Sequence, residues 1–101
     1  LLQNIGIDTT PVIADCNQSS WAQYTIRVKN RDAVQVALKD VGIPTVVYYP
    51  VPLNHQRAFP ASHCDLPVGD LAANEVLSLP FSPYITLEEQ EIVVKELLKV
   101  L

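Results

Sequence analysis

The sequence lacks methionine altogether and holds only three glycines and two cysteines. Three scattered glycines cannot build the glycine-rich loop that cradles a phosphate, so a nucleotide-binding loop of that kind is excluded. Two cysteines are too few for a disulfide-stapled scaffold, and we interpret them as reduced thiols in a cytoplasmic protein. Because a complete reading frame normally begins with methionine, we expect the chain to be part of a longer polypeptide.

Basic residues are also scarce. Seven Lys and Arg against eleven Asp and Glu give a net charge of −4. Nucleic acids and anionic membranes bind a basic face, so we expect neither as a partner. No apolar run approaches the roughly 20 residues that a membrane-spanning helix needs. With 49% hydrophobic and 18% charged residues over 101 positions, the composition is that of one globular domain.

Four side chains are of the types that ligate zinc, but their spacing argues against a metal site. They are Cys16, His55, His63 and Cys64, and no pair has the short C-x-x-C or H-x3-H spacing of a zinc motif. A lysine that holds a cofactor covalently needs a pKa lowered by burial or by a nearby cation. All four lysines fall at predicted strand ends or on exposed helix faces. We therefore predict no metal site and no catalytic residue in this chain.

The first half of the chain carries a strand–helix–strand pattern. Apolar and polar side chains alternate over 24–28, which predicts a half-buried strand. Apolar residues at i, i+3, i+4 and i+7 predict a helix over 31–41, capped by the side chain of Asn30 and ended by a positive φ at Gly42. The β-branched and aromatic run 45–49 predicts a second strand.

The second half opens with a proline-rich segment. Four prolines make 50–68 an ordered loop, followed by a short helical turn over 70–74 and a short strand over 76–79. Thr86 and Glu89 then form a capping box that opens a final helix. The sum is an α/β fold in which two main helices cover a small three-stranded sheet.

Polar groups gather where the second predicted strand ends. The candidate binding residues are Tyr48, Tyr49, Asn54, His55 and Gln56. A proline-stiffened backbone with short polar side chains suits recognition of a polyhydroxy or carboxylate ligand. Alternatively, one tyrosine packs in the core and the prolines merely end an edge strand. The residues alone leave both interpretations open, and strand alternation predicts one tyrosine inside and one outside.

Four blocks of the chain resemble the C-terminal part of DegT/StrS-type sugar aminotransferases. The blocks are Trp21–Arg27, Gly42–Thr45, Tyr49–Gln56 and Leu77–Gln90. They occur in the family's order and cover most of the sequence. The resemblance implies a pyridoxal-phosphate enzyme in which a large cofactor-binding domain precedes a small α/β domain, the C-terminal domain of a fold-type-I aminotransferase.

The resemblance also implies how the chain divides and what the intact enzyme does. Residues 1–20 would be a connector from a missing N-terminal large domain, and residues 21–101 would be the small domain. Pyridoxal phosphate and its lysine would belong to the large domain, so this chain alone would not catalyse. The intact enzyme would be a cytoplasmic homodimer that moves an amino group from glutamate to a keto group of a nucleotide-linked sugar, for a surface polysaccharide such as lipopolysaccharide.

By position, the resemblance assigns the five polar residues of 48–56 to contacts with the sugar or with a substrate carboxylate. Many members have histidine directly after the Pro-Leu pair, where this chain has Asn54, and its histidine comes one residue later. The Pro-Leu-Asn-x-Gln run is closer to members that aminate the 3-keto group of a UDP-linked N-acetylglucosaminuronic acid.

Some alternatives stay open. Arg27 either clamps a substrate carboxylate or pairs with a surface acid. The chain as a whole could instead be a non-catalytic ligand-sensing module, or an interaction domain that docks through residues 1–15.

Overall fold

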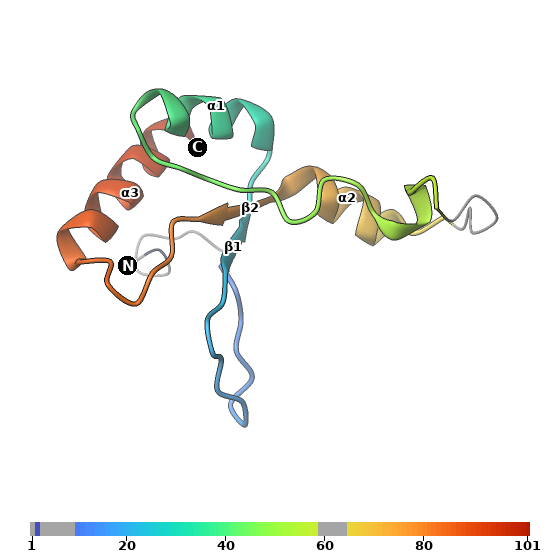
Figure 1. Cartoon of the computed structure of the whole chain (residues 1–101), viewed down its shortest axis with the longest axis horizontal. Coiled ribbons are helices and arrows are strands. Elements are labelled where there is room, and N and C mark those ends of the chain that lie inside the picture. Colours follow the sequence, from blue (N-terminus) through green and yellow to red (C-terminus); the bar gives the residue numbers. More distant parts are fainter. Residues whose placement is uncertain (1, 3–9, 59–64) are drawn as a thin grey trace.

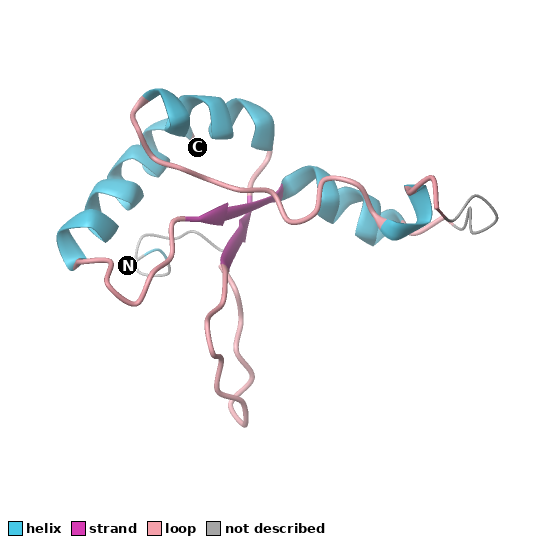
Figure 2. Cartoon of the chain, in the orientation of Figure 1, coloured by secondary structure: helices cyan, strands magenta, loops and turns pink. Residues whose placement is uncertain are grey.

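The computed structural model describes Leu2, residues 10–58 and residues 65–101. In chain order its elements are β1 (Tyr24–Arg27), α1 (Arg31–Asp40), the 3-10 turn η2 (Leu53–His55), α2 (Pro67–Glu75), β2 (Val76–Leu79) and α3 (Leu87–Val100). The two strands lie at the centre, α1 and α3 pack together on one side, and α2 runs away on the other (Figures 1 and 2).

Within the described residues the sheet has two strands, so the prediction of three strands is wrong. β1 pairs antiparallel with β2. The run 45–49 contributes a single bridge, in which the Val46 N–H donates to the Ser78 carbonyl at 3.1 Å and the Val46 carbonyl accepts from the Ser78 N–H at 2.8 Å. Pro44 lacks the N–H that the next hydrogen-bonded pair would need, and the chain bends at Tyr48. The ladder therefore stops after one bridge.

The helix α1 ends one residue earlier than predicted, in a Schellman motif. Gly42 has φ +81°, which confirms the left-handed conformation expected of it. Its N–H donates to the Lys39 carbonyl and the Ile43 N–H donates to the Leu38 carbonyl, both at 2.9 Å. This reversal buries Ile43 in the core and leaves Val41 exposed.

The start of α1 differs from the predicted side-chain cap. Asn30 occupies the N-cap position with φ 52°, and its side chain makes no capping hydrogen bond. A capping side chain reaches the helix amides from extended backbone, whereas asparagine is one of the few residues that tolerate the left-handed region. The Asn30 carbonyl instead accepts from the N–H groups of Ala33 and Val34.

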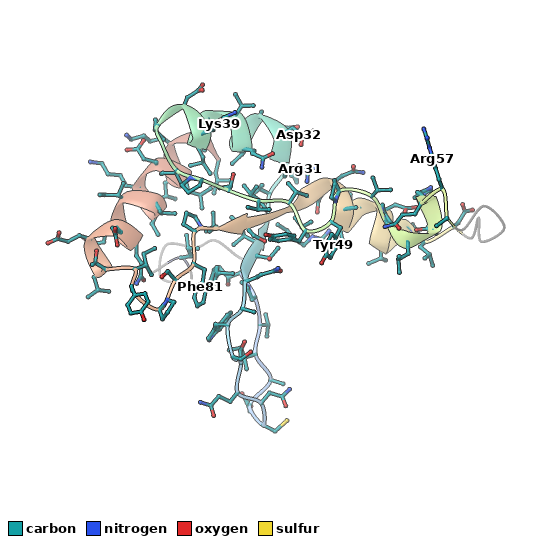
Figure 3. The ribbon with its side chains drawn as sticks, viewed as in Figure 1. Arg31, Asp32, Lys39, Tyr49, Arg57 and Phe81 are labelled. Atoms are coloured by element: carbon teal, nitrogen blue, oxygen red, sulfur yellow. The ribbon has the colours of Figure 1, made fainter. Side chains whose placement is uncertain are left out.

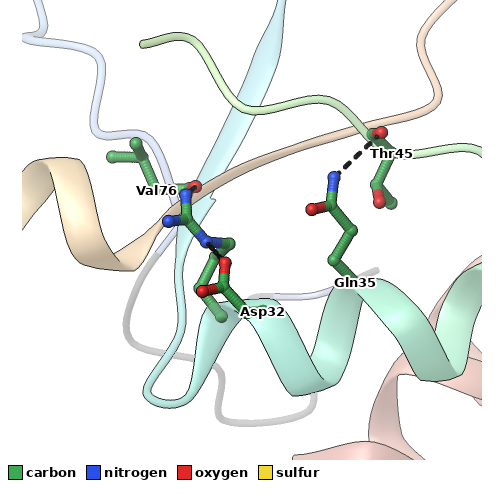
Figure 4. Close-up of polar contacts among 5 residues, drawn as sticks. Asp32, Gln35, Thr45 and Val76 are labelled. Carbon is green, nitrogen blue, oxygen red and sulfur yellow. Dashed lines mark hydrogen bonds and ion pairs between the residues drawn. The ribbon is translucent and has the colours of Figure 1, made fainter. Parts of the chain in front are cut away.

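Polar side chains of α1 tie it to its neighbours (Figure 4). Arg31 is buried, and its guanidinium donates to Asp32 at 2.5 Å and to the Val76 carbonyl at 3.3 Å. Gln35 donates to the Thr45 carbonyl at 3.3 Å. The contacts with Val76 and Thr45 hold α1 against the first residue of β2 and against the run that bridges to β2.

The helix α2 is longer than the predicted turn over 70–74, because it begins at Pro67. Proline is favoured at the first helical position, where no N–H is needed and its fixed φ already suits the helix. Asp70 lies in the first turn, where an acidic side chain is stabilised by the helix dipole. The predicted loop over 50–68 therefore ends just before Pro67, and its residues 59–64 lie outside the described part of the structure.

The capping box of α3 is confirmed. The Thr86 hydroxyl accepts from the Glu89 N–H at 3.2 Å, and the Glu89 carboxylate accepts from the Thr86 N–H at 2.8 Å. The predicted strand over 76–79 is confirmed as β2.

One apolar core joins the central elements. Its fully buried side chains come from β1, α1, β2 and α3, one from each: Ile26, Leu38, Leu77 and Leu97. The core therefore holds together the two strands and the two helices beside them.

Two extensions leave this core and give the chain an open shape (Figure 1). The N-terminal arm, residues 10–23, runs out and back beyond β1, and Trp21 stacks on Tyr24 at its base with ring centroids 5.3 Å apart. The α2 arm consists of the tyrosine loop, residues 47–58, and of α2. The radius of gyration is 15.3 Å, above the about 13 Å of a compact 100-residue domain. None of the described helices is long and apolar enough to span a membrane.

Candidate functional site

The two tyrosines stand on the surface where the tyrosine loop leaves the core. Tyr48 is 42% exposed and Tyr49 is 74% exposed. Their rings meet edge to face, with centroids 5.7 Å apart. The expectation of one inward and one outward tyrosine fails because this run is not a strand, so side-chain alternation does not apply to it. Both hydroxyl-bearing rings are thus available to a ligand.

A groove of about 460 Å³ runs between the tyrosine loop and α2. One wall includes both tyrosines and Gln56. The opposite wall is made by the small residues Gly69, Ala72 and Ala73 of α2, together with Val76 of β2. A mostly apolar groove with hydroxyl and amide groups on one wall suits a ligand that has both a ring and polar substituents.

The other three predicted site residues have different environments. Asn54 is buried, with 5% of its surface exposed. Gln56 lines the groove and its amide donates to the Val51 carbonyl at 3.5 Å. His55 is exposed and lies in the 3-10 turn η2. Asn54, which holds the position that is histidine in many of the sequences resembling this chain, lies in the same turn. The structure therefore brings Tyr48, Tyr49 and Gln56 together on one wall, whereas Asn54 and His55 are not among the groove residues. Contact of any of the five with substrate remains a prediction.

His55 reaches across to α2. Its Nε2 lies 2.9 Å from Oδ1 of Asp70, and both side chains are partly exposed. At this distance the imidazole donates to the carboxylate. This contact joins the end of the tyrosine loop to the first turn of α2.

Arg27 pairs with a surface acid, the second of the two roles considered for it. Its Nη2 and Nε donate to the same carboxylate oxygen of Glu75, at 2.6 and 3.0 Å. In Figure 3, Arg57 extends outward from the end of the tyrosine loop, away from Tyr49.

Neither metal ligands nor a cofactor lysine gather at the groove. Two of the four potential zinc ligands, His63 and Cys64, lie outside the described residues. Among the residues that the structure describes, no group of three His, Cys, Asp or Glu side chains is placed to hold a metal ion. All four lysines of the chain are exposed, as predicted.

Sequence reasoning missed the α2 wall of the groove and Asp70. Helix periodicity over 67–75 and the position of Pro67 at its start were signals that could have placed the wall on a helix. The contact between His55 and Asp70 spans 15 residues with no local pattern, so the sequence alone carries no signal for it.

Comparison with known proteins gives a consistent match. A profile of the DegT/DnrJ/EryC1/StrS aminotransferase family matches residues 1–98. The UDP-2-acetamido-2-deoxy-3-oxo-D-glucuronate aminotransferase of Pseudomonas aeruginosa is 51% identical over 84 residues, which are 83% of this chain and 23% of that protein. The chain spans about a quarter of the length of the relatives it matches.

Solved structures agree with the sequence match. A DegT/DnrJ/EryC1/StrS aminotransferase from Brucella abortus superposes with a TM-score of 0.86 at 33% identity, covering 97% of this chain and 26% of that one. The Bacillus subtilis protein NtdA, solved with its cofactor PMP bound, superposes with a TM-score of 0.80 at 30% identity, covering 98% of this chain and 24% of that one. The fold described above is therefore the fold of a quarter-length segment of such proteins.

Proposed function

Because the chain belongs to the DegT/DnrJ/EryC1/StrS aminotransferase family, we propose that it is the small domain of a pyridoxal-phosphate-dependent aminotransferase that acts on a nucleotide-linked sugar. Residues 21–101 form the domain and residues 1–20 lead into it from a large domain. The enzyme transfers an amino group from glutamate to a keto group of the sugar.

The observation that carries this proposal is the 51% identity, over 83% of the chain, to an aminotransferase named for a UDP-linked 3-oxo sugar acid. The substrate that we propose is therefore a UDP-linked N-acetylhexosaminuronic acid with a keto group at carbon 3. Its product carries an amino group at that carbon and is a precursor of a bacterial surface polysaccharide such as lipopolysaccharide.

In this proposal the chain binds and orients the sugar, and the chemistry belongs to the cofactor. Tyr48 and Tyr49 donate hydrogen bonds from the exposed wall of the groove, and Gln56 contributes its amide from the same wall. Asn54 and His55 belong to the same loop and complete the predicted set.

The residues of this chain do not fit attachment of the cofactor, since its lysines are all exposed. Pyridoxal phosphate, when bound, supplies the electron sink for transfer of the amino group. We place its binding residues in the large domain. The groove between the tyrosine loop and α2 is open on the outside, which supports an active site completed by a second surface.

We propose that the second surface comes from a partner subunit in a homodimer. Exposed apolar side chains on α2, among them Val68 and Leu71, support such an assembly because they lack a cover within the described part of the chain. The enzyme would work in the cytoplasm, where nucleotide-linked sugars are made.

The experiment is an assay of the full-length enzyme that contains this chain. We expect a pyridoxal-phosphate absorbance band that shifts on addition of glutamate, followed by amination of the UDP-linked 3-keto sugar acid. A full-length protein with no such band would contradict the proposal.

A second measurement distinguishes the small domain of an aminotransferase from a ligand-sensing module. Calorimetry of the 101-residue chain with the nucleotide sugar should give little binding, because the groove supplies one side of the site only. Tight binding of the nucleotide sugar by the chain alone would instead favour a ligand-sensing module.

A further inference from the structure

The tyrosine loop is held at both of its ends by contacts of different kinds. Before the loop begins, Val46 and Ser78 exchange two backbone hydrogen bonds, of 3.1 and 2.8 Å. Near its end, the side chains of His55 and Asp70 meet at 2.9 Å. The first contact is made by the backbone and needs only a residue other than proline at position 46, whereas the second depends on the side chains of His55 and Asp70.

Short-range backbone hydrogen bonds also form around η2, near the end of the loop. The His55 N–H donates to the Pro52 carbonyl at 3.0 Å, and the Gln56 N–H donates to the Leu53 carbonyl at 3.1 Å. These bonds fix the shape of η2, but they do not fix its distance from α2. A contact that crosses to α2 is needed for that.

The contact between His55 and Asp70 crosses the groove at one end. Gln56, the neighbour of His55, lies on the loop wall, and Gly69, the neighbour of Asp70, lies on the α2 wall. The length of this hydrogen bond therefore limits how far the two walls can separate. The backbone of Asp70 is fixed in the first turn of α2, because its own N–H donates to the Leu66 carbonyl at 2.9 Å.

We propose that Asp70 is a positioning residue for the nucleotide sugar: by holding His55, it sets the width of the groove that Tyr48 and Tyr49 line. This inference rests on the proposed function, in which the loop contacts the sugar. Asp70 touches no substrate. It acts through His55, and the effect of its loss is confined to binding of the sugar.

The test compares Asp70→Ala with Glu96→Ala in the full-length enzyme. Glu96 is a matched control, because its carboxylate also contacts a basic side chain at a partly exposed site, Lys99 on α3, remote from the groove. We expect Asp70→Ala to raise KM for the nucleotide sugar about two- to fivefold, the range for losing one partly exposed hydrogen bond. Its kcat and its KM for glutamate stay unchanged, as do all three constants in Glu96→Ala.

Three further variants test the route through His55: Asp70→Asn, His55→Ala and the double variant of His55→Ala with Asp70→Ala. Asp70→Asn keeps an oxygen acceptor and should restore part of the lost affinity. In a His55→Ala background, adding Asp70→Ala should change nothing more, because the contact is already gone. Additive losses in the double variant would overturn the route through His55.

Hydrogen exchange of the loop gives a readout that does not depend on turnover. In Asp70→Ala, amides of residues 47–56 should exchange about two- to fivefold faster than in the unsubstituted enzyme. Unchanged exchange would overturn the inference. Faster exchange with an unchanged KM would show that Asp70 holds the loop but not the sugar, and would overturn the assignment to sugar binding. Absence of transamination in the unsubstituted enzyme would instead overturn the proposed function, together with the substrate part of this inference.

Discussion

The core and the α2 arm use apolar side chains in opposite ways. In the core, Leu38 of α1 is fully buried against β1, β2 and α3. In the α2 arm, Leu71 of α2 is 52% exposed. The same residue type on two helices of similar length therefore stabilises the fold in one region and remains as uncovered surface in the other. This difference teaches that the described elements of the core cover one another, whereas the α2 arm presents uncovered apolar surface, in line with the partner surface proposed for it.

The largest expected effect is on the core side of this comparison. Leu38→Ala should lower the free energy of unfolding of the chain by about 2–5 kcal/mol, because it removes a fully buried side chain and leaves a cavity. Urea unfolding followed by circular dichroism measures the change. A loss below about 1 kcal/mol would mean that α1 can shift to fill the cavity.

The N-termini of α3, beside the core, and of α2, in the arm, also differ. The helix α3 has a capping box, whereas α2 has no side-chain cap. Thr86→Ala should cost about 1 kcal/mol of stability, since it leaves the Glu89 N–H without its acceptor. Leu66→Ala, at the equivalent position of α2, removes no cap and serves as the control. Equal losses in the two variants, measured by urea unfolding, would contradict the structural difference between the helix starts.

On the arm side, the expected effect is on function. Tyr49→Phe should raise KM for the nucleotide sugar about three- to fivefold, because it removes one hydrogen bond from the proposed contact. The measurement is steady-state kinetics of the full-length enzyme. Tyr84→Phe is the matched control, because Tyr84 is also exposed but lies in the turn before α3. If both variants raised KM equally, the loss would have no connection with the groove.

The smallest expected effect is on the free energy of unfolding when the exposed Leu71 of α2 is substituted. Leu71→Ala should change the stability of the 101-residue chain by less than about 0.5 kcal/mol, as for most exposed positions. The matched change at Leu38 makes the contrast direct, because the substitution is identical. A loss of 2 kcal/mol or more, on the order seen in buried positions, would show that α2 packs against the core in solution.

Short-range patterns predicted much of the core. Alternation over 24–28, the stripe of α1, the positive φ of Gly42 and the capping box at Thr86 are each local, and each is present with at most a residue's difference. Such features depend on a few neighbouring residues, so the sequence is sufficient to find them.

Long-range geometry was predicted less well. The run 45–49 has strand-forming residues, but its pairing with β2 was limited by Pro44 and by a bend in the chain. A proline can either interrupt a helix or occupy its first position, and only the structure shows that Pro67 is the first residue of α2. At the groove, the loop wall was predicted from its polar residues, while the α2 wall and the contact of His55 with Asp70 depend on how the chain folds back.

Trp21, the single tryptophan of the chain, stacks on Tyr24 where the N-terminal arm joins β1. Its indole is therefore a natural fluorescent probe of that junction in the 101-residue chain. Release of the arm from β1 would separate the two rings and expose the indole to water, which shifts tryptophan emission to longer wavelength. Movement of the arm relative to β1 can thus be followed without any added label.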